Sequence, residues 1–245
     1  MRRLRRMAAG ALCAIVCILP LQFLGATTAA QAAATFTPLT LKNGWTAAPF
    51  GTSNAAVSTI NGIVHFKGAI QHVTGSPFTL PAAFRPATNV YVPVDLCNAT
   101  NGRLFIRPTG VVTIEAEGGK SANAQCFTSL DGASFATSAS SFTPLTLQNA
   151  WTNAPFGTSG AAVRTISGIV HLKGAIATTQ SNMVPFTLPA GFRPAANMYV
   201  PVDLCNAHNG RLFVQPSGVV TVQPEGGDLA SAECFTSLDG AWFAP

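Results

Sequence analysis

Apolar and polar residues alternate over short stretches of the chain, and beyond the N-terminal segment no stretch shows the 3.6-residue period of an amphipathic helix. Residues 63–70 give the clearest example. Val64, Phe66 and Ile70 fall on one side of an extended chain, while His65 and Lys67 fall on the other. This pattern predicts a strand with one face in a core and the other face in water.

Similar short stretches recur along the chain with turn signals between them. We expect strands at residues 36–41, 56–60, 63–70, 78–80, 90–96, 103–107, 111–115 and 125–129. Asn61 and Gly62 form the two-residue signal of a tight hairpin, and Ser167 and Gly168 form a weaker one. This density of strands predicts an all-β fold, a small antiparallel β-sandwich of the jelly-roll kind.

The whole pattern occurs twice. Residues 36–136 return as residues 142–244, with roughly three quarters of the aligned positions identical. We therefore expect a first sandwich domain at residues 35–136, a short polar linker at 137–141 and a second sandwich domain at 142–245. The predicted architecture is two tandem copies of one fold.

The first 34 residues read as a targeting segment rather than as part of the fold. Four arginines, Arg2, Arg3, Arg5 and Arg6, precede an apolar run, and small residues follow at 30–34. This order is typical of a signal peptide that is cleaved between about residues 32 and 34. It predicts a secreted protein whose mature form does not span the membrane, and an uncleaved anchor is the alternative.

The charge of the chain changes once this segment is set aside. Four of the fourteen Lys and Arg lie in it, which leaves ten against nine Asp and Glu. A nearly neutral chain offers no patch able to neutralise many phosphates, so nucleic acid is excluded as a partner. We expect no cofactor and no metal, because the histidines are isolated and no C-x-x-C spacing occurs.

Four cysteines follow the targeting segment: Cys97, Cys126, Cys205 and Cys234. Each repeat carries its own pair at the same spacing, so the favoured pairing is Cys97 with Cys126 and Cys205 with Cys234. Each bridge would stabilise its domain by roughly 3 to 4 kcal/mol on the chain-entropy model. The alternative is a zinc site made of four thiolates.

The order of motifs resembles that of a known family. NGWT, GIVHFKGAI, FTLPAAFRPA and NGRLFIRPTGVVTI follow one another within each repeat, most specifically as LPAAFRP at residues 80–86 and LPAGFRP at 188–194. This order resembles the C-terminal head domains of phage tail-fibre and receptor-binding proteins. The resemblance implies a β-sandwich that binds cell-surface glycans or other surface receptors, often as a trimer, here in a secreted bacterial tandem repeat.

Two kinds of residue are candidates for binding a polyhydroxylated ligand. Asn and Arg side chains supply hydrogen-bond donors and acceptors in two corresponding loops, and a Trp follows a turn in each repeat, where it could stack on a sugar ring. The candidates are Trp45, Asn98, Asn101 and Arg103 in the first repeat, and Trp151, Asn206, Asn209 and Arg211 in the second. Two alternatives stay open: the Asn-Gly pairs are turn residues, and the tryptophans belong to the core.

The sequence therefore favours a non-enzymatic protein that recognises a surface glycan or cell-wall component through two equivalent sites. One alternative is a structural protein whose sandwiches self-associate, so that the partner is a second copy of the chain. The other is a glycan hydrolase, which would need Asp95 and Glu117 to line one cleft.

Overall fold

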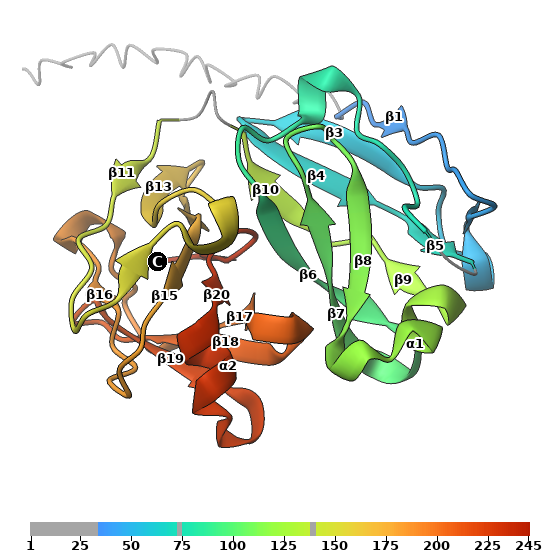
Figure 1. Ribbon diagram of the computed structural model, residues 1–245. Helices are drawn as coiled ribbons and strands as arrows, with labels where there is room; N and C mark the ends of the chain where they lie inside the picture. Colours follow the sequence, from blue (N-terminus) through green and yellow to red (C-terminus); the bar gives the residue numbers. More distant parts are fainter. Residues whose placement is uncertain (1–33, 73–74, 138–140) are drawn as a thin grey trace, which may run out of the picture. The chain divides into compact units, whose positions relative to one another are not determined.

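The computed structural model describes residues 34–72, 75–137 and 141–245, and residues 34–245 belong to one compact unit. The predicted signal peptide lies outside the described residues except for Ala34, and so does most of the predicted linker. Strands in antiparallel sheets make up most of the regular structure (Figure 1). The predicted all-β fold is confirmed.

The first repeat is a sandwich of two sheets. One has the order β1 (Thr37–Pro38), β3 (Ala56–Ile60), β4 (Ile63–Lys67), β10 (Ser134–Ala136). The other has the order β2 (Thr46–Ala47), β5 (Ala69–Gln71), β9 (Thr128–Ser129), β6 (Val90–Leu96), β7 (Thr100–Ile106), β8 (Val112–Ala116). Val57 and Phe66 of the first sheet and Leu104 and Val112 of the second share one hydrophobic core, because alternate side chains of both sheets point between them.

The second repeat has the same plan. One sheet has the order β11 (Thr143–Pro144), β13 (Ala162–Ile166), β14 (Ile169–Lys173), β21 (Trp242–Phe243). The opposite layer consists of β12 (Thr152–Asn153), β15 (Ala175–Ala177), β20 (Thr236–Ser237) and of β16 (Phe186–Thr187), β19 (Val219–Pro224), β18 (Asn209–Val214), β17 (Met198–Asp203). A bridge between Leu204 and Thr236 links these two sheets. The repeat has its own core, separate from that of the first repeat.

Both predicted hairpin turns are present. Asn61 and Gly62 have φ angles of 52° and 83°, and Ser167 and Gly168 have φ angles of 49° and 82°. Two successive positive φ values match the right-handed twist of the flanking strands. The turns join β3 to β4 and β13 to β14.

The expectation of one continuous strand at residues 63–70 is wrong. The chain breaks at Gly68, which has a φ of +90°, and β4 and β5 then belong to different sheets. A Cβ atom at Gly68 would lie 2.4 Å from the carbonyl oxygens of both Ser53 and Asn54. Only glycine allows the two backbone segments to approach this closely. The break lets β4 join one sheet of the sandwich and β5 the other.

The predicted strand at residues 125–129 is wrong in its first part. Residues Ser121–Cys126 form helix α1, Leu229–Cys234 form α2 in the second repeat, and only Thr128–Ser129 pairs as β9. Six residues make fewer than two turns, too few to show a helical period. Short 3-10 turns complete each repeat: η1 (Pro49–Gly51), η2 (Ala82–Phe84), η3 (Cys97–Ala99) and η4 (Glu117–Gly119), then η5 (Pro155–Gly157), η6 (Ala190–Phe192), η7 (Cys205–Ala207) and η8 (Glu225–Gly227).

The predicted disulfide pairing is confirmed. Cys97 is bonded to Cys126 and Cys205 to Cys234, with 5.7 Å between the Cα atoms of each pair. The bridges tie η3 to α1 and η7 to α2, so the thiols are not free to form a zinc site. Over the described residues, every helix is too short or too polar to cross a bilayer.

Candidate functional site

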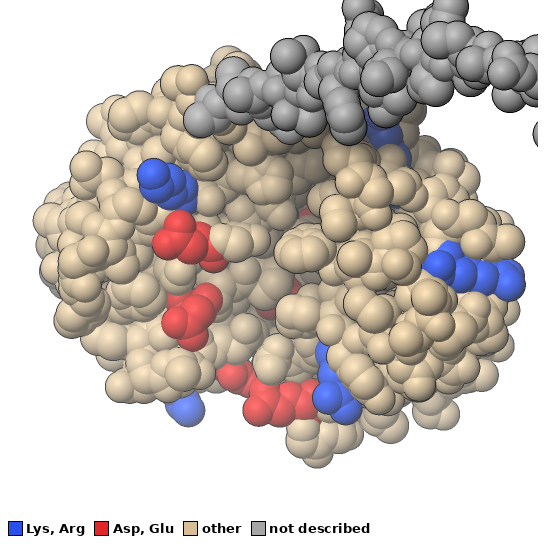
Figure 2. All heavy atoms as spheres, turned by 180° about the vertical axis from the view of Figure 1, so that it is seen from behind, with Lys and Arg blue, Asp and Glu red and all other residues tan. Residues whose placement is uncertain are grey.

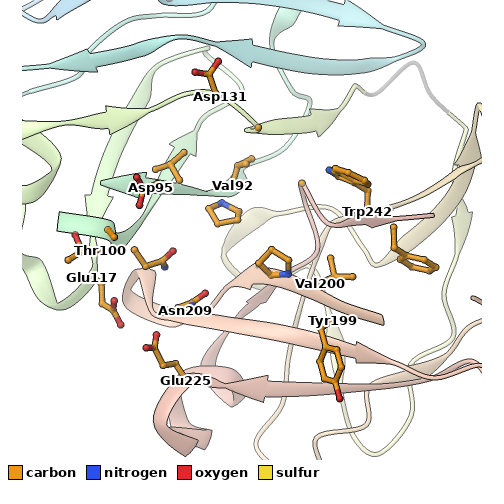
Figure 3. Close-up of a pocket in the computed structure, with 18 of the residues that line it drawn as sticks. Val92, Asp95, Thr100, Glu117, Asp131, Tyr199, Val200, Asn209, Glu225 and Trp242 are labelled. Atoms are coloured by element: carbon orange, nitrogen blue, oxygen red, sulfur yellow. The ribbon is translucent and has the colours of Figure 1, made fainter. Parts of the chain in front are cut away.

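A groove of about 900 Å³ lies between the two repeats. Strand β6, turn η3 and strand β7 of the first repeat contribute one part of its lining, and β17, β18 and β21 of the second contribute the other. Its polar side chains are Asp95, Thr100, Asn101, Glu117, Asp131, Asn209 and Glu225 (Figure 3). A concavity of this size can enclose a small ligand or a few sugar rings.

Two exposed aromatic side chains belong to this groove. Tyr199 is 57% exposed and Trp242 is 51% exposed. The ring of Tyr199 stacks on Phe213 with 5.0 Å between ring centroids, and the guanidinium carbon of Arg211 lies 4.7 Å from the Tyr199 centroid. These contacts hold the Tyr199 ring in place, and an ordered, exposed ring is suited to stacking on an apolar face of a ligand.

The charge of the groove is negative. Asp95, Glu117, Asp131 and Glu225 line it, and neither Lys nor Arg does so among the described residues. Glu117 and Glu225 lie near each other beside Asn209 (Figure 3). On the face drawn in Figure 2, acidic side chains gather around the central hollow, while basic ones are scattered. Such a lining favours a ligand that donates hydrogen bonds or carries positive charge.

Two candidate residues of the first loop, Asn101 and Arg103, are engaged in the contact between the repeats. The Nδ2 atom of Asn101 donates a hydrogen bond to the carbonyl oxygen of Ala207 at 2.7 Å. Arg103 pairs with Asp203 at 3.0 Å and with Glu115 at 2.6 Å. Asn98 is exposed in turn η3. Arg103 is therefore a residue of the contact between repeats in this structure, and its hydrogen bonds are committed there.

The second loop has different surroundings. Asn209 lines the groove, Arg211 is exposed and donates to Gln223 at 2.9 Å, and Asn206 is exposed in turn η7. The two loops, although nearly identical in sequence, are thus not in equivalent environments.

The alternative that the Asn-Gly pairs are turn residues is wrong. Asn101 lies in β7 opposite Asp95, and Asn209 lies in β18 opposite Asp203. The chain reverses earlier, in η3, where Asn98 and Ala99 have φ angles of 62° and 54°. Gly102 is needed for a different reason, since a Cβ atom there would lie 2.5 Å from the Leu96 side chain.

Both candidate tryptophans belong to the cores. Trp45 and Trp151 are 7% and 5% exposed, and each is part of its repeat's hydrophobic cluster. Their Nε1 atoms donate to the carbonyl oxygens of Gly75 and Asn182, at 3.1 and 2.8 Å. This burial favours the core role that the sequence left open over stacking on a sugar.

Sequence reasoning did not select Trp242 or Tyr199. Trp242 replaces the Ser134 of the first repeat, and this difference between the copies is a signal that could have identified it. Tyr199 has an identical counterpart, Tyr91, which is buried against the second repeat. No comparison of the two sequences could therefore have distinguished the exposed tyrosine from the buried one.

One carboxylate at the contact between the repeats, Asp203, is fully buried. Burial raises the pKa of Asp203 to about 7, although the Arg103 guanidinium acts in the opposite direction. The Oδ1 atom of Asp203 has no hydrogen-bond partner. Among the described residues, no three His, Cys, Asp or Glu side chains are grouped so that they could hold a metal ion.

Comparisons of the chain with protein-family models, with curated proteins and with solved structures give no match. The groove therefore indicates the chemistry of a ligand through three properties: its volume, its two exposed rings and its acidic lining. These three properties describe the chemistry of a ligand that would fit there, and they do so without reference to any other protein.

Proposed function

We propose that the protein is a non-enzymatic glycan-binding protein and that the groove between the repeats is its binding site. The observation that carries this proposal is the combination of two exposed aromatic rings, Tyr199 and Trp242, with carboxylate and amide side chains in one concavity. Aromatic rings stack on the apolar faces of sugars, and carboxylates and amides accept hydrogen bonds from hydroxyl groups. The glycan is neutral or bears amino groups, because the lining is acidic.

Other observations support a secreted protein with a ligand at a cell surface. Two disulfides are typical of proteins in an oxidising compartment. They agree with the secretion that the N-terminal pattern predicts. The resemblance to phage receptor-binding heads also favours a surface glycan or a cell-wall component as the ligand. In this proposal, one site shared by both repeats takes the place of the two equivalent sites expected from the sequence.

Binding to three soluble probes tests this function: an oligomer of glucosamine, its N-acetylated form and the anionic polymer alginate. We expect binding to one or both of the first two, stronger than to alginate, and weakened by salt where amino groups are present. Trp242→Ala should weaken binding at least about tenfold, because it removes a stacking surface. Leu229→Ala, a change at a 42% exposed residue outside the groove, is the control. Folded protein that binds none of the probes, or alginate best, would contradict the proposal.

One observation favours a second candidate function, glycan hydrolysis. Asp95 and Glu117 line the same groove, as a pair of catalytic carboxylates would. Hydrolysis predicts release of reducing ends from a bound glycan. It also predicts that Asp95→Asn and Glu117→Gln abolish turnover while binding persists. Binding without turnover by the unchanged chain would exclude this candidate.

A further inference from the structure

The equivalent hairpin turns of the two repeats meet where Asn61 Nδ2 donates to the Ser167 hydroxyl at 3.3 Å. Beside this meeting, the two repeats are joined by a contact between different surfaces of the same fold. We call the residues that the first repeat contributes the docking face: Asn89, Tyr91, Asn101 and Arg103. We call those of the second repeat the receiving face: Phe156, Asp203, Ala207, Phe235 and Ser237. A contact between unlike surfaces is heterologous, so each repeat uses only one of its two faces.

The centre of this contact is aromatic and buried. The Tyr91 ring meets the Phe235 ring edge-on at 5.0 Å between centroids, and these residues are 8% and 1% exposed. The hydroxyl of Ser237 donates to the carbonyl oxygen of Tyr91 at 2.6 Å. The Arg103–Asp203 ion pair lies beside them, and the Asp203 side chain is fully buried. Buried aromatic and arginine anchors are the features that dominate the energy of protein interfaces.

The second repeat carries an unoccupied copy of the docking face. Asn197, Tyr199, Asn209 and Arg211 are identical to the four docking residues of the first repeat. Their arrangement is also the same, since an arginine lies over the tyrosine ring at 4.7 Å in the second repeat and at 4.8 Å in the first.

A concavity of about 450 Å³ surrounds Arg211 on this face. On the first repeat, turn η7 of the second repeat packs at the corresponding place, against β7, β8 and η4. The shape of the free docking face therefore matches a turn of this kind.

The first repeat carries an unoccupied copy of the receiving face. Phe50 and Phe127 correspond to Phe156 and Phe235, and their ring centroids are 5.9 Å apart, against 5.7 Å in the second repeat. Phe50 is 78% exposed. Asp95, which corresponds to the buried Asp203, is exposed. An exposed phenylalanine that packs on a half-buried one, on a face that also carries an exposed carboxylate, is typical of an interaction surface.

A difference beside the two docking faces changes how the arginine is balanced. Arg103 is balanced by Glu115 as well as by Asp203, whereas Arg211 contacts the uncharged Gln223 in the place of Glu115. Among the ion pairs of the described residues none includes Arg211. The free docking face thus presents an arginine that is in no ion pair of the described residues, with Glu225 in the same concavity, and the free receiving face presents a carboxylate, Asp95. An unpaired arginine and an exposed carboxylate are the complementarity that a second copy would need.

We propose that the docking face of the second repeat binds the receiving face of the first repeat of another copy of this chain. Arg211 pairs with Asp95, and Tyr199 packs on Phe127, as Arg103 and Tyr91 do within the chain. Each chain keeps one free face of each kind, so association extends head to tail into rings or filaments. Tyr199 and Asp95 also line the groove, so a bound second copy competes with a glycan for them. Association of the chains requires no glycan.

Sedimentation velocity without any glycan tests the association. We expect oligomers whose share rises with protein concentration. Arg211→Asp and Asp95→Arg each remove one face, and each should weaken association at least about tenfold. Both residues are exposed, so neither change disturbs a core. Arg164→Asp, a matched change on β13 in the opposite layer of the same repeat, should associate like the unchanged chain.

An equimolar mixture of the two variants gives the sharpest outcome. The Arg211→Asp chain keeps its receiving face and the Asp95→Arg chain keeps its docking face, so these intact faces can bind each other. The aspartate introduced at 211 also complements the arginine introduced at 95, so the mixture should associate although neither variant does so alone. Three results would overturn the proposal: an unchanged chain that stays monomeric up to about 1 mM, variants that associate as well as it does, or a mixture that stays monomeric.

Discussion

Asp239 and Asp131 occupy the same position in the two repeats but differ in burial. Asp239 is 2% exposed, whereas Asp131 is exposed in the groove. Burial raises the pKa of Asp239 to about 7, while a hydrogen bond from the Gly174 amide and the charge of Lys173 act in the opposite direction. Between pH 4 and 7 the folded chain therefore holds a proton on Asp239 that the unfolded chain has lost. Stability falls as pH rises through this range.

Asp239→Asn should make the unfolding free energy fall less steeply as the pH rises. One proton contributes up to about 1.4 kcal/mol per pH unit to the slope of the unfolding free energy. Asn cannot ionise, and its amide oxygen can still accept a hydrogen bond from the Gly174 amide. The slope of the unfolding free energy against pH should therefore be smaller in the variant by the contribution of one proton. The buried Asp203, whose pKa is also raised to about 7, keeps its own share. Urea unfolding at pH 4, 5, 6 and 7 measures the slope. Asp131→Asn is the control, and an equal change of slope in both variants would contradict the assignment.

For individual residues, the sequence predicted covalent pairing better than it predicted the surroundings of each side chain. The disulfide pairing followed from the duplication, since each copy held one complete pair. The environment of Asp95 and Asp203 could not follow from it, because both lie in the same local sequence, VDLCNA. One is exposed and the other is buried, and the cause is the packing of one repeat on the other. Residue patterns carry no information on a contact of that kind.

Among the secondary-structure elements, the break between β14 and β15 shows why the prediction of strands from the sequence was incomplete. Gly174 has a φ of +92°, and a Cβ atom there would lie 2.3 Å from the carbonyl oxygen of Gly160. Alternation of apolar residues continues across this point, so it predicted the strand residues correctly but not the change of sheet. A glycine inside a strand pattern was the available signal for a close backbone approach.

Gly174→Ala and Gly168→Ala separate the two costs of replacing such a glycine. Both positions have a positive φ, but the Cβ of an alanine at 168 would meet no atom within 4 Å. We expect Gly168→Ala to lower the free energy of unfolding by about 1 to 2 kcal/mol, from backbone strain alone. Gly174→Ala should cost at least about 3 kcal/mol, because the backbones must also move apart. Equilibrium denaturation compares them, and equal losses would show that the close approach at Gly174 is not a constraint.

In the whole molecule, two sandwiches with separate cores form one compact unit. The duplication predicted two copies of one fold. It could not predict which face of one copy meets which face of the other, because both copies carry nearly the same residues on both faces. The groove, which needs side chains from both repeats, was unpredictable for the same reason. The asymmetry of the contact between repeats thus accounts for the site residues that sequence reasoning did not select.

The Arg103–Asp203 pair should contribute strongly to the coupling of the two repeats. Arg103→Met leaves the fully buried Asp203 carboxylate without its partner, and loss of one member of a buried pair costs about 3 to 5 kcal/mol. We therefore expect Arg103→Met to destabilise the chain and to separate the unfolding of the repeats in calorimetry. Arg211→Met, the exposed counterpart, should change the unfolding free energy by less than about 0.5 kcal/mol. Adding Asp203→Asn to Arg103→Met should restore part of the loss, because no buried charge remains. Equal effects of the two single substitutions would show that the ion pair does not couple the repeats.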